Sequence, residues 1–256
     1  MFRKIAANFG VRVGSALLNL VLAILFSQVL GPEGKGEQSL LLTTVAIIII
    51  FDGLIGGASL VYLSSRLSWK RLIIAAYVWC VLVSGLTFLA LLSVFHFSAQ
   101  SALNIVILSA LSSFTSVNAS LLLGKEKLKA YNAIQLIVPI LTLLVVLIQY
   151  YILQSIFYEW ALFTAYMSSL LLSILLLDLH WSKQEDASKW SIIWQQLFQF
   201  GFMNQLAHVL QLLSFRLTFY LLAAQGAHAG VGLMSNASSI TESIWLVASS
   251  ISLWQY

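Results

Sequence analysis

Eight long apolar stretches limit what this chain can fold into. A bilayer core about 30 Å thick is crossed by about 20 helical residues, and lipid requires the backbone polar groups to be satisfied within each segment. Each stretch is therefore predicted to be a membrane-spanning helix, so the expected fold class is an all-α, polytopic transmembrane bundle of about eight helices. The stretches cover residues 11–30, 39–63, 72–95, 102–123, 131–153, 159–177, 198–224 and 231–254.

The scarcity of charge supports the same fold. Of the 256 residues, 60% are hydrophobic and 9% are charged, whereas soluble domains average roughly 25% charged residues. This composition excludes a cytosolic enzyme, a nucleic-acid-binding domain and a disordered chain.

The basic residues are distributed unevenly between the expected connections. Lys35 lies on one side of the membrane, flanked by Glu33 and Glu37, and Arg216 falls inside the seventh stretch. Because cytoplasmic loops carry an excess of Lys and Arg, the N-terminus is predicted to be cytoplasmic, and topology explains the bases without a nucleic-acid partner. The bases on the cytoplasmic side are Arg3, Lys4, Arg12, Arg66, Lys70, Arg71, Lys125, Lys127, Lys129, Lys183 and Lys189.

The expected connections are short. Residues 31–38 combine Gly31 and Pro32 in a pattern typical of turns, and the longest connection is expected over residues 178–197. No connection is long enough for a soluble domain, so any activity is expected within the bundle. No metal or cofactor is expected, because Cys80 is the one cysteine and no histidine has metal-ligand spacing to a second His or Cys.

The first expected hairpin is echoed near the end of the chain. Residues 31–36 align with residues 225–230, and each segment leads into a small and apolar run. Parallel repeats of six helices are a recurrent plan in transporters. The chain is therefore interpreted as a six-helix N-terminal lobe with its cytoplasmic linker, residues 1–194, followed by the first two helices of a second lobe, residues 195–256. On this interpretation the protein is incomplete.

Two regions carry a resemblance to a known family. The chain resembles bacterial polysaccharide-export proteins, the O-antigen and exopolysaccharide flippases of the multidrug/oligosaccharidyl-lipid/polysaccharide (MOP) exporter superfamily. The matching residues are Asn8-Phe-Gly, Phe26-Ser-Gln-Val-Leu-Gly-Pro-Glu-Gly-Lys-Gly-Glu37, Asp52-Gly53, Gly56-Gly57, Phe200-Gly201, Phe215-Arg216 and the segment from Ala229 to Trp245. The chain departs from the family where Leu217 and Thr218 follow Arg216, because many members place an acidic residue there.

Arg216 is the first of three ionisable residues expected at membrane depth, where each costs roughly 2.5–3.5 kcal/mol on insertion scales. At 100° per residue, one arc of about 80° on the seventh helix holds several polar residues, and Gln205 and Arg216 border it. This face is interpreted as a cavity wall, with Arg216 binding a pyrophosphate through its planar fork of donors. The alternative is an arginine that pairs with Asp52 or Glu242 to hold helices together. The polar residues of the face are Asn204, His208, Gln211 and Thr218.

Asp52 and Glu242 are the two carboxylates at membrane depth. Asp52 lies near the middle of the second stretch, where carboxylates couple transport to a proton or Na⁺ in many carriers. The alternative is a neutral, hydrogen-bonded Asp52 beside an irregularity in its helix. Glu242 is expected to form hydrogen bonds between helices.

The resemblance and the charges together imply a transporter. The expected function is the movement of polyprenyl-pyrophosphate-linked oligosaccharide repeat units across the bacterial inner membrane, for O-antigen, capsule or exopolysaccharide synthesis, without enzymatic chemistry. The implied partners are this lipid-linked oligosaccharide, membrane lipids, a proton or Na⁺ counter-ion and a polysaccharide polymerase. Alternatives are a multidrug or cation antiporter of the same superfamily, a membrane-embedded polysaccharide polymerase and an acyltransferase.

Overall fold

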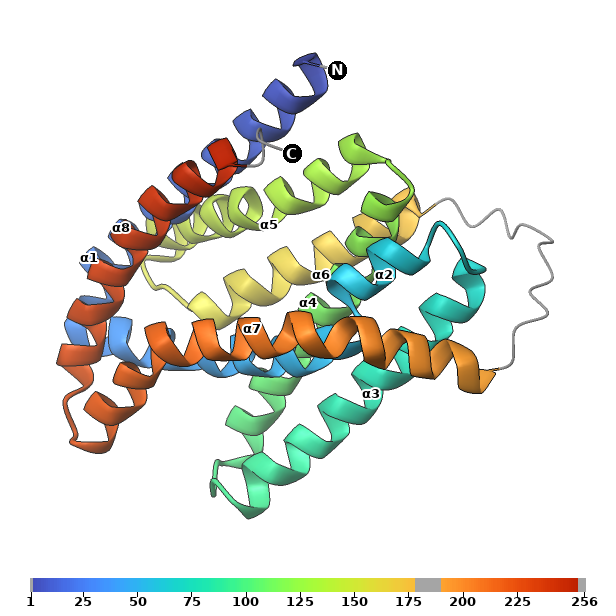
Figure 1. Cartoon of the computed structure of the whole chain (residues 1–256). Helices are drawn as coiled ribbons and strands as arrows, with labels where there is room; N and C mark the ends of the chain where they lie inside the picture. The colour runs from blue at the N-terminus through green and yellow to red at the C-terminus, as the bar shows by residue number, and fades with distance from the viewer. Residues whose placement is uncertain (1, 178–189, 253–256) are drawn as a thin grey trace. The chain divides into compact units, whose positions relative to one another are not determined.

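The computed structural model describes residues 2–177 and 190–252, and every regular element in these ranges is helical (Figure 1). The expectation of an all-α fold is confirmed there. The elements are α1 (Phe2–Asp52), η1 (Gly53–Ile55), α2 (Gly57–Leu63), α3 (Trp69–Ser93), α4 (Ala99–Gly124), α5 (Leu128–Ile148), η2 (Gln149–Leu153), α6 (Tyr158–Leu176), α7 (Trp190–Ala224) and α8 (His228–Ser252).

Six helical segments among the described residues are long and apolar enough to cross a membrane. They indicate a membrane protein. The expected number of about eight spans is not confirmed, because the first two stretches lie within one continuous segment and α8 is not among the six. The six segments are Phe9–Leu63, Trp69–Ser93, Ala99–Gly124, Leu128–Leu153, Tyr158–Leu176 and Trp190–Ala224.

α1 is interrupted at one residue. Gly31 has φ 69° and ψ 179°, and Pro32 follows it directly. Glycine adopts a positive φ without steric penalty, and proline suits the first turn of a helix because its missing N–H would have no partner there. The loop expected over residues 31–38 is therefore wrong, since helix resumes immediately after Gly31 and the ribbon changes direction there (Figure 1).

The second expected span, residues 39–63, is divided after Asp52. A 3₁₀ turn follows over Gly53–Ile55, and Gly56 then adopts an extended conformation with φ −135° and ψ −159°. Gly57 has φ 50° and begins α2. The backbone between Asp52 and Gly57 therefore leaves α-helical geometry in the middle of an apolar segment.

The connection expected over residues 178–197 is shorter in the structure. α7 begins at Trp190, so the prediction of a loop was wrong for residues 190–197. Ile193 and Leu197 are one helical turn apart and fully buried in an apolar cluster, which explains why this segment is helical. Residues 178–189, which include the expected loop bases Lys183 and Lys189, lie outside the described residues.

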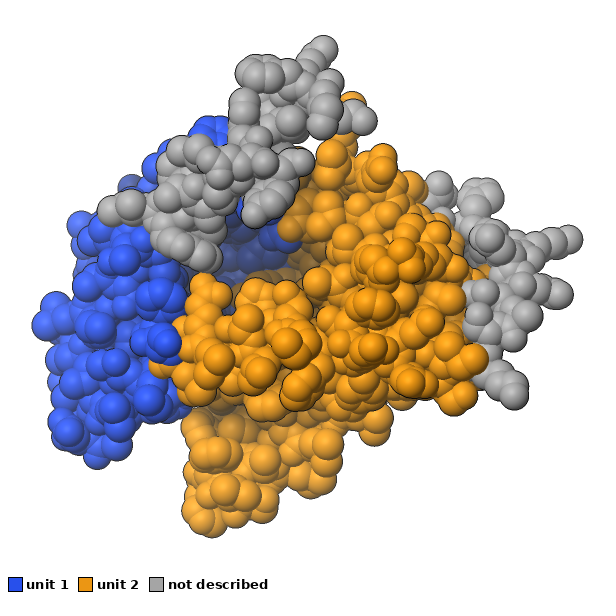
Figure 2. Space-filling view, in the orientation of Figure 1, with its two compact units in different colours: residues 1–43, 135–165, 214–256 blue, residues 44–134, 166–213 orange. Residues whose placement is uncertain are grey.

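The chain forms two compact units, coloured separately in Figure 2. Unit 1 contains residues 1–43, 135–165 and 214–256, and unit 2 contains residues 44–134 and 166–213. The core of unit 2 includes Ile55, Leu72 and Cys80, whereas Leu22, Phe26 and Val146 pack together in unit 1. The proposed lobes, residues 1–194 and 195–256, stay a prediction.

Candidate functional site

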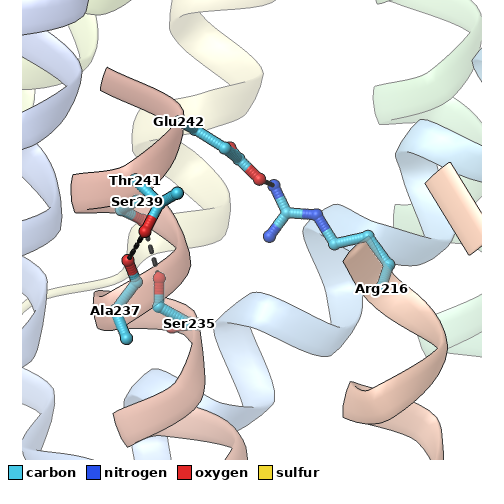
Figure 3. Close-up of polar contacts among 6 residues, drawn as sticks. All are labelled: Arg216, Ser235, Ala237, Ser239, Thr241 and Glu242. Atoms are coloured by element: carbon cyan, nitrogen blue, oxygen red, sulfur yellow. Dashed lines mark hydrogen bonds and ion pairs between the residues drawn. The ribbon is translucent and has the colours of Figure 1, made fainter. Parts of the chain in front are cut away.

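Arg216 and Glu242 form an ion pair within unit 1 (Figure 3). Arg216 Nη2 donates to Glu242 Oε1 at 2.6 Å, and the two side chains are 25% and 34% exposed. The rest of the guanidinium points away from the carboxylate (Figure 3). Of the two partners expected for Arg216, the structure brings Glu242 to it, and the pair joins α7 to α8.

The hydroxyl groups of α8 near this pair bond mainly to their own helix. Ser239 donates to the Ser235 carbonyl at 2.8 Å, and Thr241 donates to the Ala237 carbonyl at 3.0 Å (Figure 3). Such bonds satisfy a hydroxyl group without a partner from another helix. These bonds satisfy the hydroxyl groups of α8 within the helix itself. The contact of α8 with α7 at this level is the ion pair of Glu242 with Arg216.

α8 also contacts α1 within unit 1. Asn236 Nδ2 donates to Ser27 Oγ at 2.7 Å. A Cβ atom added to Gly36 would lie 2.1 Å from the His228 carbonyl oxygen, and one added to Gly232 would lie 2.1 Å from the Pro32 carbonyl oxygen. The two turns aligned in sequence, residues 31–36 and 225–230, are therefore close neighbours, with glycine permitting the contact.

Lys35 departs from its expected position. It was predicted to be a base of an outer loop, but it is 5% exposed, while Glu33 and Glu37 are exposed. Its Nζ donates to Gln38 Oε1 at 2.9 Å and lies 5.8 Å from the centroid of the Phe26 ring. Because the helix resumes at Pro32, Lys35 lies on a helical face. The spacing of Lys35 and Gln38, three residues apart, is the one sequence signal for this contact.

Asp52 lies at the helix break of unit 2. The side chain is 3% exposed, and Ser113 of α4 donates a hydrogen bond to Oδ2. Oδ1 is buried and has no hydrogen-bond partner among the described residues. The expected irregularity beside Asp52 is present as η1. A buried carboxylate oxygen without a donor is where a proton or a small cation would bind.

Gln205 lies at the same helix break. Its Nε2 donates to the Ile50 carbonyl at 2.7 Å, and the side chain is buried. A Cβ atom added to Gly53 would lie 2.0 Å from Gln205 Nε2, and one added to Gly201 would lie 1.9 Å from the Leu54 carbonyl oxygen. Gln205 therefore compensates for a backbone hydrogen bond that the end of α1 leaves unmade.

The other residues of the predicted polar face lie on α7, which is continuous from Trp190 to Ala224. The helical spacing on which the face was predicted is therefore present. Asn204 and Gln211 are half-buried, and His208 is exposed. Their role in binding a substrate stays a prediction.

A buried polar chain in unit 2 was not identified from the sequence. Tyr77 donates to Asn118 Oδ1 at 2.7 Å, and Asn118 Nδ2 donates to Ser173 Oγ at 2.8 Å. These residues connect α3, α4 and α6. An asparagine inside an apolar stretch was the available signal, but its partners come from helices far apart in sequence.

The described residues contain no group of three or more His, Cys, Asp or Glu side chains that could hold a metal ion. Two polar arrangements remain as candidate functional sites. They are the Arg216–Glu242 pair in unit 1 and the Asp52 carboxylate in unit 2. No known protein family, no curated protein and no solved structure matches the chain.

Proposed function

We propose that this protein is a transmembrane transporter of the flippase type. It moves polyprenyl-pyrophosphate-linked oligosaccharide units across the bacterial inner membrane for O-antigen, capsule or exopolysaccharide synthesis. A polysaccharide polymerase then uses the exported units. Six membrane-length helical segments among the described residues support the transporter class, and the resemblance of the first hairpin to polysaccharide exporters supports the substrate class.

The observation that carries this proposal is the Arg216–Glu242 pair. Both side chains are partly exposed, and one guanidinium nitrogen contacts the carboxylate. A pyrophosphate is a stronger acceptor than one carboxylate because it offers several charged oxygens to the planar fork of arginine. The substrate is therefore proposed to replace Glu242 at Arg216.

Asp52 has a separate role in the proposal. Its buried oxygen without a donor is suited to a proton or Na⁺, and uptake of that ion would drive transport. The same observation favours a second candidate, a cation-coupled antiporter of the same superfamily. The two candidates differ in whether a pyrophosphate-linked lipid is the transported molecule.

Substitutions of Arg216 test the role of the ion pair in transport. The protein is reconstituted in liposomes with a fluorescent polyprenyl-pyrophosphate disaccharide, and flipping is measured as protection of the fluorophore from an impermeant quencher. Arg216→Ala is expected to lower flipping about tenfold or more because a charge-assisted contact contributes about 1.5–3 kcal/mol. Arg216→Lys retains part of the rate, since it keeps the charge and loses the fork. Arg66→Ala removes an exposed arginine outside the six helical segments and serves as the control.

Glu242→Gln gives an opposite expectation. Removing the carboxylate leaves Arg216 without a competing anion. The Glu242→Gln variant is therefore expected to bind the pyrophosphate lipid more tightly than the unmodified protein, whereas the Arg216→Ala variant is expected to bind it more weakly. A protein that flips the lipid equally well with Arg216→Ala would overturn the proposal. Transport of cations without any flipping would favour the antiporter instead.

A further inference from the structure

A pocket of about 670 Å³ opens within unit 1. Its volume falls in the range of small-molecule sites, about 300–1,000 Å³. Arg216, Glu242 and Asp52 do not line it. The lining residues are Val29, Leu30, Tyr150, Tyr151, Gln154, Ser155 and Ile156.

The pocket wall is built from irregular backbone. The α5 helix ends in a π-helical turn, Gln149–Leu153, and Gln154 then adopts a left-handed conformation with φ 51°. The Gln149 side chain holds this turn by accepting from the Phe157 N–H at 3.1 Å. π-helical turns and left-handed non-glycine residues are frequent at functional sites, and here both place side chains at one pocket.

The lining combines aromatic, amide and hydroxyl groups and contains no charged residue. Tyr150 and Tyr151 are 50% and 74% exposed, and their rings meet at 80° with centroids 5.1 Å apart. Gln154 and Ser155 add donors and acceptors, while Val29, Leu30 and Ile156 supply an apolar surface. This surface matches a neutral ring that has apolar C–H faces and hydroxyl groups at its edge.

We infer that this pocket binds an uncharged sugar ring. The inference rests on the proposed function, because the lipid-linked oligosaccharide would supply the ring. The ring of Tyr151 packs on one face of the sugar, the ring of Tyr150 meets its edge, and Gln154 and Ser155 hydrogen-bond to its hydroxyl groups. The pocket thereby recognises the glycan, whereas Arg216 recognises the pyrophosphate.

Tyrosines are also enriched at membrane interfaces, where they anchor a helix at the headgroup level. That role requires no sugar. It also predicts no difference between substitutions at the pocket and at its exposed neighbour Ile152, which is 72% exposed and does not line the pocket. Ile152 therefore provides a matched control in the same turn.

The test is binding of lactose, maltose and cellobiose to the full chain in phosphatidylcholine nanodiscs, which contain no glycosylated detergent. Saturation-transfer NMR reports which sugar protons contact the protein. At least one disaccharide is expected to bind the unmodified chain. Tyr151→Ala and Gln154→Ala are each expected to weaken binding about two- to tenfold, the range for one aromatic contact or one hydrogen bond. Ile152→Ala is expected to leave binding unchanged.

Three results would overturn the inference: no disaccharide binds, the pocket substitutions have no effect, or Ile152→Ala weakens binding equally. Thermal unfolding of each variant in the same nanodiscs separates loss of binding from loss of folding. Sugar binding without any flipping of the lipid substrate would retain the pocket and contradict the proposed function. Flipping that depends on Arg216, without sugar binding, would retain the function and contradict the pocket.

Discussion

The carbonyl group of Ile50 depends on a single side chain. In a continuous α-helix the N–H of Leu54 would donate to the Ile50 carbonyl, but α1 ends at Asp52. The side-chain amide of Gln205 donates to the Ile50 carbonyl instead. Gln205→Leu keeps a similar volume but removes the donor. It is expected to lower the free energy of unfolding by about 1–3 kcal/mol, since a buried carbonyl is left unsatisfied. Thermal unfolding in detergent micelles, followed by tryptophan fluorescence, would show a lower midpoint.

Gln211→Leu is the control for this prediction, because Gln211 lies on the same helix and is half-buried. It makes the same chemical change away from the break. Equal midpoints for the two variants would show that the bond to Ile50 contributes no stability.

Residue types and spacing identified part of the candidate site from the sequence. The polar face of α7 followed from helical periodicity, and the partner expected for Arg216 was narrowed to two carboxylates, of which Glu242 is observed. The partner of Gln205 could not be predicted, because its bond depends on where α1 ends. Lys35 was assigned to a loop for the same reason: its burial depends on a helix that resumes at Pro32.

Two glycines allow the close approach of α1 and α8. Gly36→Ala would place a Cβ atom 2.1 Å from the backbone oxygen of His228, so the helices would have to move apart. Overpacking of this kind costs typically about 1–3 kcal/mol, which equals or exceeds the gain of about 1 kcal/mol from replacing glycine by alanine in a helix. We expect a lower thermal midpoint for Gly36→Ala and for Gly232→Ala.

Gly85→Ala tests the same replacement without the contact. Gly85 lies in α3, and a Cβ atom there meets nothing within 4 Å. Its midpoint is expected to stay the same or rise, since only the helix propensity changes. If the thermal midpoint of Gly85→Ala fell as far as that of Gly36→Ala, the loss of glycine flexibility would explain both results, and the packing explanation would be wrong.

Apolar length predicted helix within each long stretch, because each segment must satisfy its backbone groups in lipid, but it missed the helical residues 32–38 and 190–197. It did not predict where the helices break. Gly31 interrupts α1 at one residue, and Gly56 separates η1 from α2, whose first residue Gly57 has a positive φ. One glycine leaves the mean hydropathy of a long window almost unchanged. Hydropathy therefore does not report these breaks, which depend on the backbone conformation of single residues.

For the whole molecule, the distribution of bases is the main guide to topology. Two connections that were predicted to be cytoplasmic, residues 64–71 and 124–130, lie together within unit 2, beside the start of α7. Arg71 lies 5.8 Å from the Trp190 ring, and Lys125 Nζ lies 3.4 Å from the Trp69 ring. Gly124 also contacts Ser64, because a Cβ atom added to Gly124 would lie 2.0 Å from the Oγ atom of Ser64. These contacts agree with the expectation that residues 64–71 and 124–130 share one side of the membrane.

The direction of insertion is tested by cysteine accessibility. Cys80 is buried in α3, so Cys80→Ser provides a background without other thiols, to which Glu33→Cys or Lys129→Cys is added. Both positions are exposed. Because the positive-inside rule places Lys129 in the cytoplasm, an impermeant maleimide is expected to label Glu33→Cys in intact cells. Lys129→Cys should react only after permeabilisation. The reversed pattern would invert the topology, and labelling of both in intact cells would show that an odd number of crossings does not separate them.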